Sequence, residues 1–218
     1  MEVIHETAMD CWIEALKLII DKGVDFKDEN NRICREMLNL KIVVKKPFFE
    51  INKPIKTLFG FNEWKYPSID EISKVILSDK LEPGYSYSYG TRIFNFQNKI
   101  NQLNEFLIPL LKDSPNSRRA VISLWDPIVD SNLLNRENPG LISVDFKMRR
   151  NKLNLTAIVR SNDLFFGWPA NIYQLFVLQE YVKRALSCDF GNITTFSTSA
   201  HVFNDQFKFI EKILSKKN

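Results

Sequence analysis

The chain contains few of the residues that build disulfide frameworks and metal sites. Three cysteines and two histidines occur among 218 residues, and no two cysteines stand in a CxxC spacing. An odd number of unpaired thiols does not indicate a disulfide framework, and so few histidines do not make a convincing zinc site. We therefore interpret Cys11, Cys34 and Cys188 as free structural thiols in a reducing compartment.

Long apolar runs and a strong net charge are also missing. Residues 1–10 carry charges within the first six positions, and no segment predicts a secretory signal or a membrane span. The formal net charge of +4 is too weak to indicate polynucleotide binding. We expect a cytoplasmic protein that has neither nucleic-acid nor membrane partners.

A hydrophobic content of 44% is enough for one sizeable core. Apolar spacing and turn residues predict, in the first half, a helix at Met9–Ile20 closed by a left-handed Gly23, a buried strand at Met37–Val44, irregular chain from Pro47 to Pro67, a helix opened by a Ser68–Glu71 capping box, and a helix from Gln97 to Leu111 limited by Pro109. In the second half they predict strands at Ala120–Trp125, Leu141–Met148, Leu153–Val159 and Ile193–Phe203, and helices at Ile172–Leu186 and Phe207–Leu214. No linker or repeat divides the chain, so we predict a single α+β domain over residues 1–218.

Three sequence blocks stand in a distinctive order. Ser114–Val121 ends in paired arginines before a strand and has Tyr89-Gly90 upstream, Arg160–Ile172 leads into the long helix, and His201–Asn204 follows a strand. This order and spacing resemble the thymidylate synthase and pyrimidine hydroxymethylase superfamily, and the N-terminal half resembles its short archaeal-type members. The resemblance implies a mixed β-sheet with packed helices, a nucleoside monophosphate as the bound partner, and a homodimer with composite sites.

The resemblance also implies roles for individual residues. Arg160 and Ser161 would bind the phosphate, and Arg118 and Arg119 would reach it from the partner subunit, because guanidinium forks pair with phosphate oxygens at any working pH. Without that context the paired arginines are more typical of a solvated strand start.

Base and sugar recognition would come from the two later blocks. Asn171 would distinguish a uracil-type ring from cytosine, because one carboxamide can donate to O4 and accept from N3–H. His201 would bond the ribose 3′-hydroxyl, and Asp163 would position a pterin and ordered water. The alternatives are a helix N-cap for Asn171, a core histidine for His201 and a turn carboxylate for Asp163.

The resemblance fails at the position of the family's nucleophile. That cysteine lies in a Pro-Cys-His segment twenty residues before the position of Arg160, and here the segment is Pro139-Gly140-Leu141. Glycine has no side chain that could add to pyrimidine C6. Phe203 likewise replaces a tyrosine that bonds the sugar, which leaves the choice between ribose and deoxyribose open.

Three functions follow from this combination. The chain is predicted to be a transferase-like enzyme that acts on a uracil-type nucleotide without the usual nucleophile, with Tyr89, Asp163 or bound water transferring protons. The alternatives are a non-catalytic nucleotide sensor or partner subunit, and an ordinary thymidylate synthase. The sequence does not identify the cofactor: methylenetetrahydrofolate stays open, although the short stretch Phe48–Pro67 differs from the family's folate-side segment.

Overall fold

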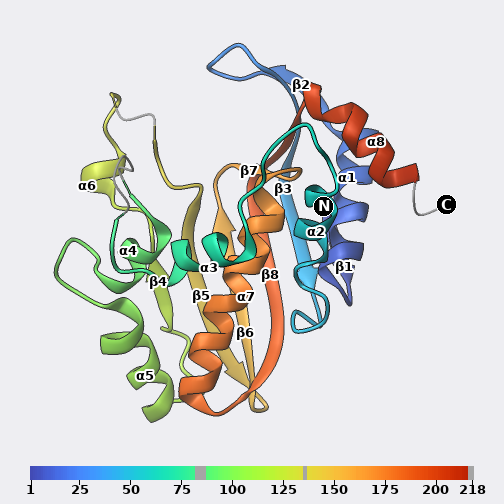
Figure 1. Cartoon of the computed structure of the whole chain (residues 1–218). Coiled ribbons are helices and arrows are strands. Elements are labelled where there is room, and N and C mark those ends of the chain that lie inside the picture. The colour runs from blue at the N-terminus through green and yellow to red at the C-terminus, as the bar shows by residue number, and fades with distance from the viewer. Residues whose placement is uncertain (82–86, 135–136, 216–218) are drawn as a thin grey trace.

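The computed structural model describes residues 1–81, 87–134 and 137–215 (Figure 1). The strands are β1 Glu2–His5, β2 Val24–Lys27, β3 Ile33–Val44, β4 Val121–Ser123, β5 Leu141–Arg149, β6 Lys152–Val159, β7 Asn162–Asp163 and β8 Asp189–Phe203. The helices are α1 Ala8–Lys22, α2 Lys53–Phe59, α3 Ile69–Leu77, α4 Tyr89–Phe94, the π-helix η1 Gln102–Leu107, α5 Ile108–Asp113, α6 Pro127–Asp130, α7 Gly167–Leu186, the 3₁₀ helix η2 Asn204–Gln206 and α8 Phe207–Ser215.

One mixed sheet organises the chain. Its strands lie in the order β1-β3-β8-β6-β5-β4, with β2 paired to β3 and β7 paired to β8. The β1–β3 and β6–β8 pairs are parallel, whereas β3–β8, β5–β6 and β4–β5 are antiparallel. The predicted α+β fold with a mixed sheet and packed helices is confirmed.

Helices cover one face of this sheet. The helix α7 packs on β6 and β8, and α1 packs on β1 and β3 beside it (Figure 1). Trp12 of α1 and Trp168 of α7 are fully buried there, and their indole N–H groups donate to the Leu164 carbonyl and to Thr195 Oγ1. Because buried indole donors need a partner, these two bonds tie both helices to the strand region that carries the site.

The opposite face of the sheet is only half buried. Its residues alternate with core residues along the central strands and include Asp145, Thr156, Ile158, Thr194 and Phe196. Such alternation is typical of a sheet with one face on the core and the other face available to solvent or to a partner.

The central pair β3–β8 changes face along its length. Before Asn39 along β3 the nearest buried residue is Met37, and after it the buried residues include Leu40 and Ile42. The alternation of buried and exposed side chains therefore shifts by one residue at Asn39. Asn39 takes a left-handed φ of 57° and has no partner in the ladder, which pairs Leu38 with Ser199 and Leu40 with Ser197. The register is the same before and after this point, so neither strand has an extra residue, and the side chains exchange faces in both strands at the same place.

Several local predictions are confirmed by the structure. The Ser68 hydroxyl accepts from the Glu71 amide while the Glu71 carboxylate accepts from the Ser68 amide, as a capping box requires. The predicted strands Leu141–Met148 and Leu153–Val159 form an antiparallel pair, and the turn between them runs through Arg150 and Asn151, both with positive φ. All three cysteines are free and buried, and Cys11 donates to the Val43 carbonyl.

Other local predictions are wrong in their details. Gly23 is extended, with φ of −68°, rather than left-handed. A glycine is required at position 23 because no side chain fits there: a Cβ would lie 2.6 Å from Arg35 Cγ and closer still to the Ile19 carbonyl. The stretch from Pro47 to Pro67 is not wholly irregular, because it contains α2 with Pro54 in its first turn, where a missing N–H costs nothing.

The helix predicted from Gln97 is also shorter than expected. Residues 96–100 form a turn closed by a bridge between Phe96 and Ile100, and the helix begins only at Gln102 as a π-helix. Pro109 does not limit it, because it stands in the first turn of α5. Within the part of the chain that the structure describes, no helix is long and apolar enough to cross a membrane.

Candidate functional site

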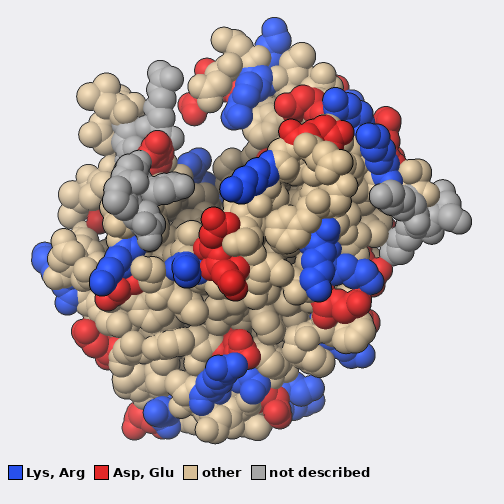
Figure 2. Space-filling model, in the orientation of Figure 1, with Lys and Arg blue, Asp and Glu red and all other residues tan. Residues whose placement is uncertain are grey.

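The predicted site residues other than Arg118 and Arg119 converge on one end of the sheet, beyond the C-terminal end of β6. The Arg160 amide donates to the Gly140 carbonyl at 2.8 Å, and the Thr198 hydroxyl donates to the Arg160 carbonyl at 2.8 Å. Asp163 then pairs with His201 where β7 joins β8. At this end of the molecule, Figure 2 shows a hollow between the protruding α6 segment and the end that carries β2.

Gly140 faces the centre of this region. A Cβ built on it would lie 3.0 Å from the Ser161 carbonyl oxygen and 3.7 Å from the Tyr89 hydroxyl. Burial raises the pKa of the Tyr89 phenol, opposed by a hydrogen bond from the Leu141 backbone and by the Arg160 charge. Tyr89 is therefore a protonated donor at neutral pH, placed where a side chain at position 140 would point.

Arg160 is held by the chain that leads to Gly140. Its Nε donates to the Pro139 carbonyl at 3.0 Å and one terminal nitrogen donates to the Asn138 carbonyl at 2.9 Å. The other terminal nitrogen has no partner among the described residues. The neighbouring Ser161 is exposed, and its hydroxyl is likewise uncommitted within the described part of the chain.

Asp163 is half-buried at the start of the turn into α7. One carboxylate oxygen accepts the Phe165 and Phe166 amides at 2.8 and 3.1 Å, and the other accepts from Gln206 Nε2 at 3.2 Å. Burial raises the pKa of the Asp163 carboxyl, while these amides and the His201 ring oppose the rise. The hydrogen bonds of Asp163 are therefore those of a turn carboxylate, as the alternative predicted. The raised pKa also makes Asp163 a group that can exchange a proton.

His201 is 9% exposed and lies between strands that carry acids on both sides. Its ring meets the Phe203 ring edge to face at 5.1 Å, and neither ring nitrogen hydrogen-bonds to any residue that the structure describes. Burial lowers the pKa of His201, against the pull of Asp163 and Glu36. The alternative of a core histidine satisfied by backbone groups is wrong.

Asn171 is within the first turns of α7 rather than at its cap. The N-cap residue is Phe166, so the alternative that Asn171 caps the helix is wrong. Its Nδ2 lies 3.9 Å from the point where a Gly167 Cβ would stand, and that point is 3.4 Å from Asp163 Cβ. Gly167 thus leaves open space between Asn171 and Asp163, and no described residue hydrogen-bonds to the carboxamide.

Arg118 and Arg119 do not join this group within one chain. Both are exposed in the loop before β4, where the next residue, Ala120, accepts the Phe146 amide. Phe146 lies six residues along β5 from Gly140, a distance of about 20 Å at roughly 3.3 Å per residue. Neither guanidinium has a partner among the described residues, and neither can reach the Gly140 region of its own chain.

Two charged residues at the site were missed by sequence reasoning. Glu36 stands opposite His201 in the β3–β8 ladder, and the Arg32 guanidinium covers the Phe203 ring at 4.2 Å. The predicted strand Met37–Val44 covers only the later part of β3 and begins after Glu36, and its register against β8 was not predicted. No local motif marks either residue, so only the strand pairing places them beside His201.

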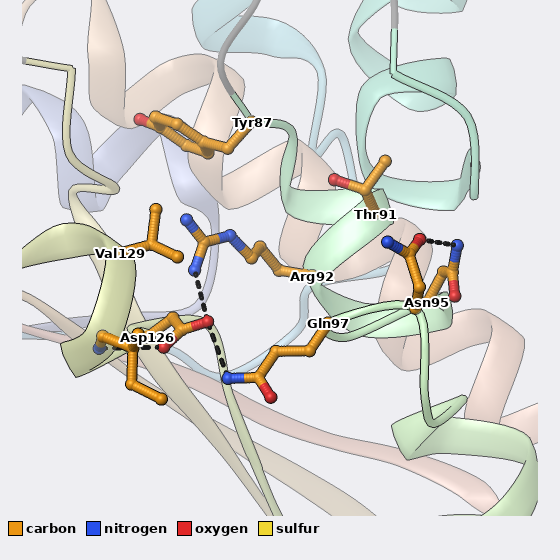
Figure 3. A pocket seen from close by; sticks show the side chains of 9 residues that line it. Tyr87, Thr91, Arg92, Asn95, Gln97, Asp126 and Val129 are labelled. Carbon is orange, nitrogen blue, oxygen red and sulfur yellow. Dashed lines mark hydrogen bonds and ion pairs between the residues drawn. The ribbon is translucent and has the colours of Figure 1, made fainter.

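A separate polar cluster lies between α4 and α6. A cavity of about 460 Å³ opens there, and Figure 3 shows Arg92 and Gln97 both pointing to Asp126 in its wall. Arg92 also donates to both oxygens of the buried Asp130 at 2.8 and 3.2 Å. Two carboxylates already engage this arginine, so the cluster joins α4 to the segment before Gly140 rather than offering a free cation.

No group of three or more metal-binding side chains occurs in the described ranges 1–81, 87–134 and 137–215. The three thiols are not activated as nucleophiles either. Cys11 lies on the buried face of α1, where burial raises its pKa to about 12, and burial also raises the pKa of Cys34 and Cys188. Each is therefore a poor thiolate at neutral pH.

Comparison with known proteins agrees with this geometry. The family model described as thymidylate synthase matches residues 25–218. A Methanosarcina barkeri protein is 32% identical over 213 residues, covering 98% of this chain and 94% of its own, and a Methanosarcina mazei protein is 34% identical over 205 residues, covering 94% and 90%. Both carry the name "Putative thymidylate synthase". The thymidylate synthase of Phytoplasma mali is 28% identical over 172 residues, covering 72% of this chain and 58% of its own. The matched region includes the strand-end site just described, and the chain belongs to the thymidylate synthase family.

Proposed function

We propose that the protein binds a uracil-type nucleoside monophosphate at the Gly140 end of the sheet and acts on it without a cysteine nucleophile. The observation that carries the proposal is a set of uncommitted polar groups at one place. Among the described residues, the Ser161 hydroxyl, the Asn171 carboxamide and the His201 ring have no hydrogen-bond partner, although His201 is buried. Ser161 is exposed and Asn171 is half-buried, so a ligand in the hollow can reach this set and would supply its hydrogen-bond partners.

The proposed phosphate end lies at Arg160 and Ser161. Arg160 is positioned by two backbone carbonyls and keeps one terminal nitrogen for a phosphate oxygen. The proposed base lies toward Asn171, in the space beside Gly167, and the sugar lies toward His201. The proposed chemistry is proton transfer to or from the bound ring, with the Tyr89 phenol as donor and the Asp163 carboxyl as exchangeable acid or base.

A homodimer would complete the phosphate site. Arg118 and Arg119 have no partners within the described chain and stand about 20 Å from their own Gly140, so they would serve a second copy. The half-buried sheet face, with Ile158 and Phe196 near its middle, is a suitable surface for that copy. Composite sites of this kind predict complementation between two differently damaged subunits.

Subunit mixing tests the composite site. An Arg118→Ala/Arg119→Ala subunit mixed with an Asn171→Ala subunit leaves one intact site in each heterodimer. We expect each parent to lose nucleotide binding and the mixture to regain part of it. If the mixture binds no more than the parents, the arginines do not act across a dimer.

Calorimetric titration tests the proposed ligand. Deoxyuridylate, uridylate, deoxycytidylate and their nucleosides form the panel, and Arg160→Ala and Asn171→Ala are the test variants. We expect the uracil monophosphates to bind and both variants to lose that binding, whereas Arg184→Ala, on the exposed end of α7, serves as the matched control. Binding of none of these nucleotides would contradict the proposal.

The family relationship favours one second candidate, ordinary C5 methyl transfer. Release of tritium from C5-labelled deoxyuridylate with methylenetetrahydrofolate distinguishes the two. We expect no release from the natural chain, because position 140 has no thiol and the three cysteines are buried elsewhere. Gly140→Cys is expected to regain some release, since its Cβ requires only a small shift of the Ser161 carbonyl.

A further inference from the structure

The half-buried carboxylate of Glu36 lies beside the proposed sugar position. In the ladder between β3 and β8, Glu36 is the direct partner of His201, and Asp163 is the partner of His201 from β7. Residues that pair directly across strands project on the same face, with Cβ atoms about 4.5–5.5 Å apart. The structure therefore presents a row of carboxylate, imidazole and carboxylate across three strands.

Glu36 is oriented but not neutralised. Its Oε1 accepts a short hydrogen bond from the Ser199 hydroxyl, two residues before His201 on the same strand. The other oxygen, Oε2, has no partner among the described residues, and Glu36 forms no ion pair with them. The Arg32 guanidinium is held 2.8 Å from Asp28 and lies over Phe203.

A carboxylate in this position has a specific use. One carboxylate accepts hydrogen bonds from both hydroxyls of a cis-diol, and proteins that bind dinucleotides recognise ribose with an acidic residue in this way. A deoxyribose has only the 3′-hydroxyl to donate, which His201 alone could bond. An acidic group beside His201 would therefore be superfluous for a deoxynucleotide and useful for a ribonucleotide.

We propose that Glu36 makes the site selective for a ribonucleoside monophosphate over its deoxy analogue. This inference rests on the proposed nucleotide function and names the substrate class of the same site. Ser199 fixes the carboxylate, His201 bonds one hydroxyl, and the free Oε2 of Glu36 accepts from the neighbouring one. Phe203, packed against the His201 ring and covered by Arg32, forms the apolar wall of the sugar position.

The test compares uridylate with deoxyuridylate by calorimetry in the natural chain and in Glu36→Gln. A lost hydrogen bond to a charged group weakens binding by about tenfold or more, so we expect the natural chain to favour uridylate by at least about tenfold. Glu36→Gln should bring the ratio close to one and leave deoxyuridylate affinity nearly unchanged. Glu2→Gln, which removes an exposed carboxylate from β1, should keep the full preference.

Further variants separate recognition from folding. Glu36→Asp keeps the charge but retracts it by one methylene, so it should fold normally and lose most of the preference. Ser199→Ala frees the carboxylate and should reduce the preference partly. Arabinosyl uridylate, whose 2′-hydroxyl points to the other side of the sugar, should bind the natural chain no better than deoxyuridylate.

Failure of this inference differs from failure of the function on which it rests. If both nucleotides bind equally and still require Arg160, the nucleotide site stands and the role of Glu36 is refuted. An unchanged ratio in Glu36→Gln and Glu36→Asp refutes it equally. If neither nucleotide binds, the proposed function fails and the inference fails with it.

Discussion

Replacing Asp130 with alanine removes the carboxylate that holds Arg92 between α4 and α6. The Arg92 side chain is 11% exposed and the Asp130 side chain 0%, so solvent cannot take over the lost contacts. The same substitution also removes the acceptor of the Asp126 amide, which donates to Asp130 at 2.8 Å. Breaking a buried pair by removing one partner typically costs about 3–5 kcal/mol, because the remaining charge stays buried.

The expected loss can be measured by thermal and urea unfolding. For a chain of this size, 1 kcal/mol corresponds to a shift in Tm of about 2–4 °C, so Asp130→Ala should unfold about 6–20 °C lower. Glu180→Gln is the matched control, since its partner Arg184 is largely exposed and the pair contributes about 0.5 kcal/mol at most. A double variant, Arg92→Met with Asp130→Leu, should recover part of the loss because the unpaired Arg92 charge is removed, while the buried Asp126 keeps hydrogen bonds from Gln97 and the Ile128 amide.

The outcome that refutes this reasoning is a small effect. If Asp130→Ala costs less than about 1 kcal/mol, water or Asp126 must satisfy Arg92, and the cluster does not hold α4 to α6. A large effect in the Glu180→Gln control would show instead that the measurement responds to charge in general.

Three further predictions concern the local structure. Gly23→Ala should destabilise the fold by about 1–3 kcal/mol because its Cβ would collide with backbone. Gly140→Ala should change the free energy of unfolding by less than about 1 kcal/mol, because its Cβ meets only one close atom. Equal effects of the two variants in urea unfolding would contradict this difference in available space. Ser68→Ala should cost about 1 kcal/mol by removing the cap of α3, measured in the same way, and no change would mean that the cap is replaced by water. The pKa of Cys11 is raised by burial to about 12 in the folded state, against about 8.5 when unfolded, so its contribution to stability is complete below about pH 8.5 and is lost as pH rises toward 12. The urea midpoint should therefore fall more steeply between pH 8.5 and 11 in the natural chain than in Cys11→Ala, and parallel curves would rule out a buried thiol.

The long strands could be predicted because each has a continuous apolar pattern. Leu141–Met148 and Leu153–Val159 coincide with β5 and β6 to within one residue at each end. The edge strand β2 could not be found in this way, because every one of its residues is exposed and it is stabilised only by pairing with β3. The turn at 96–100 escaped prediction because the apolar residues around it continue a helical spacing that the backbone does not follow.

Part of the site was predictable from local sequence. Arg160, Ser161 and Asp163 lie close together along the chain, and Asn171 is eight residues after Asp163, near the start of α7, so their proximity needs no long-range information. The position of Glu36 beside His201 depends on the alignment of β3 with β8 and on the interruption at Asn39. That alignment is a tertiary property, decided by how both strands pack under α1 and α7.

The interruption at Asn39 divides the β3–β8 pair into two regions whose side chains pack against different parts of the molecule. On one side, Leu40 and Ile42 must fit the helices; on the other, Glu36 and its neighbours must fit whatever enters the hollow. Because the exchange of faces occurs in β3 and β8 together, the ladder remains continuous through it. Substitutions at Glu36 can therefore accumulate without disturbing the packed core, whereas loss of the single residue Asn39 would turn one set of side chains to the wrong side. A family that changes substrate while keeping its fold would be expected to vary on the Glu36 side of this point and to preserve the length of the strand.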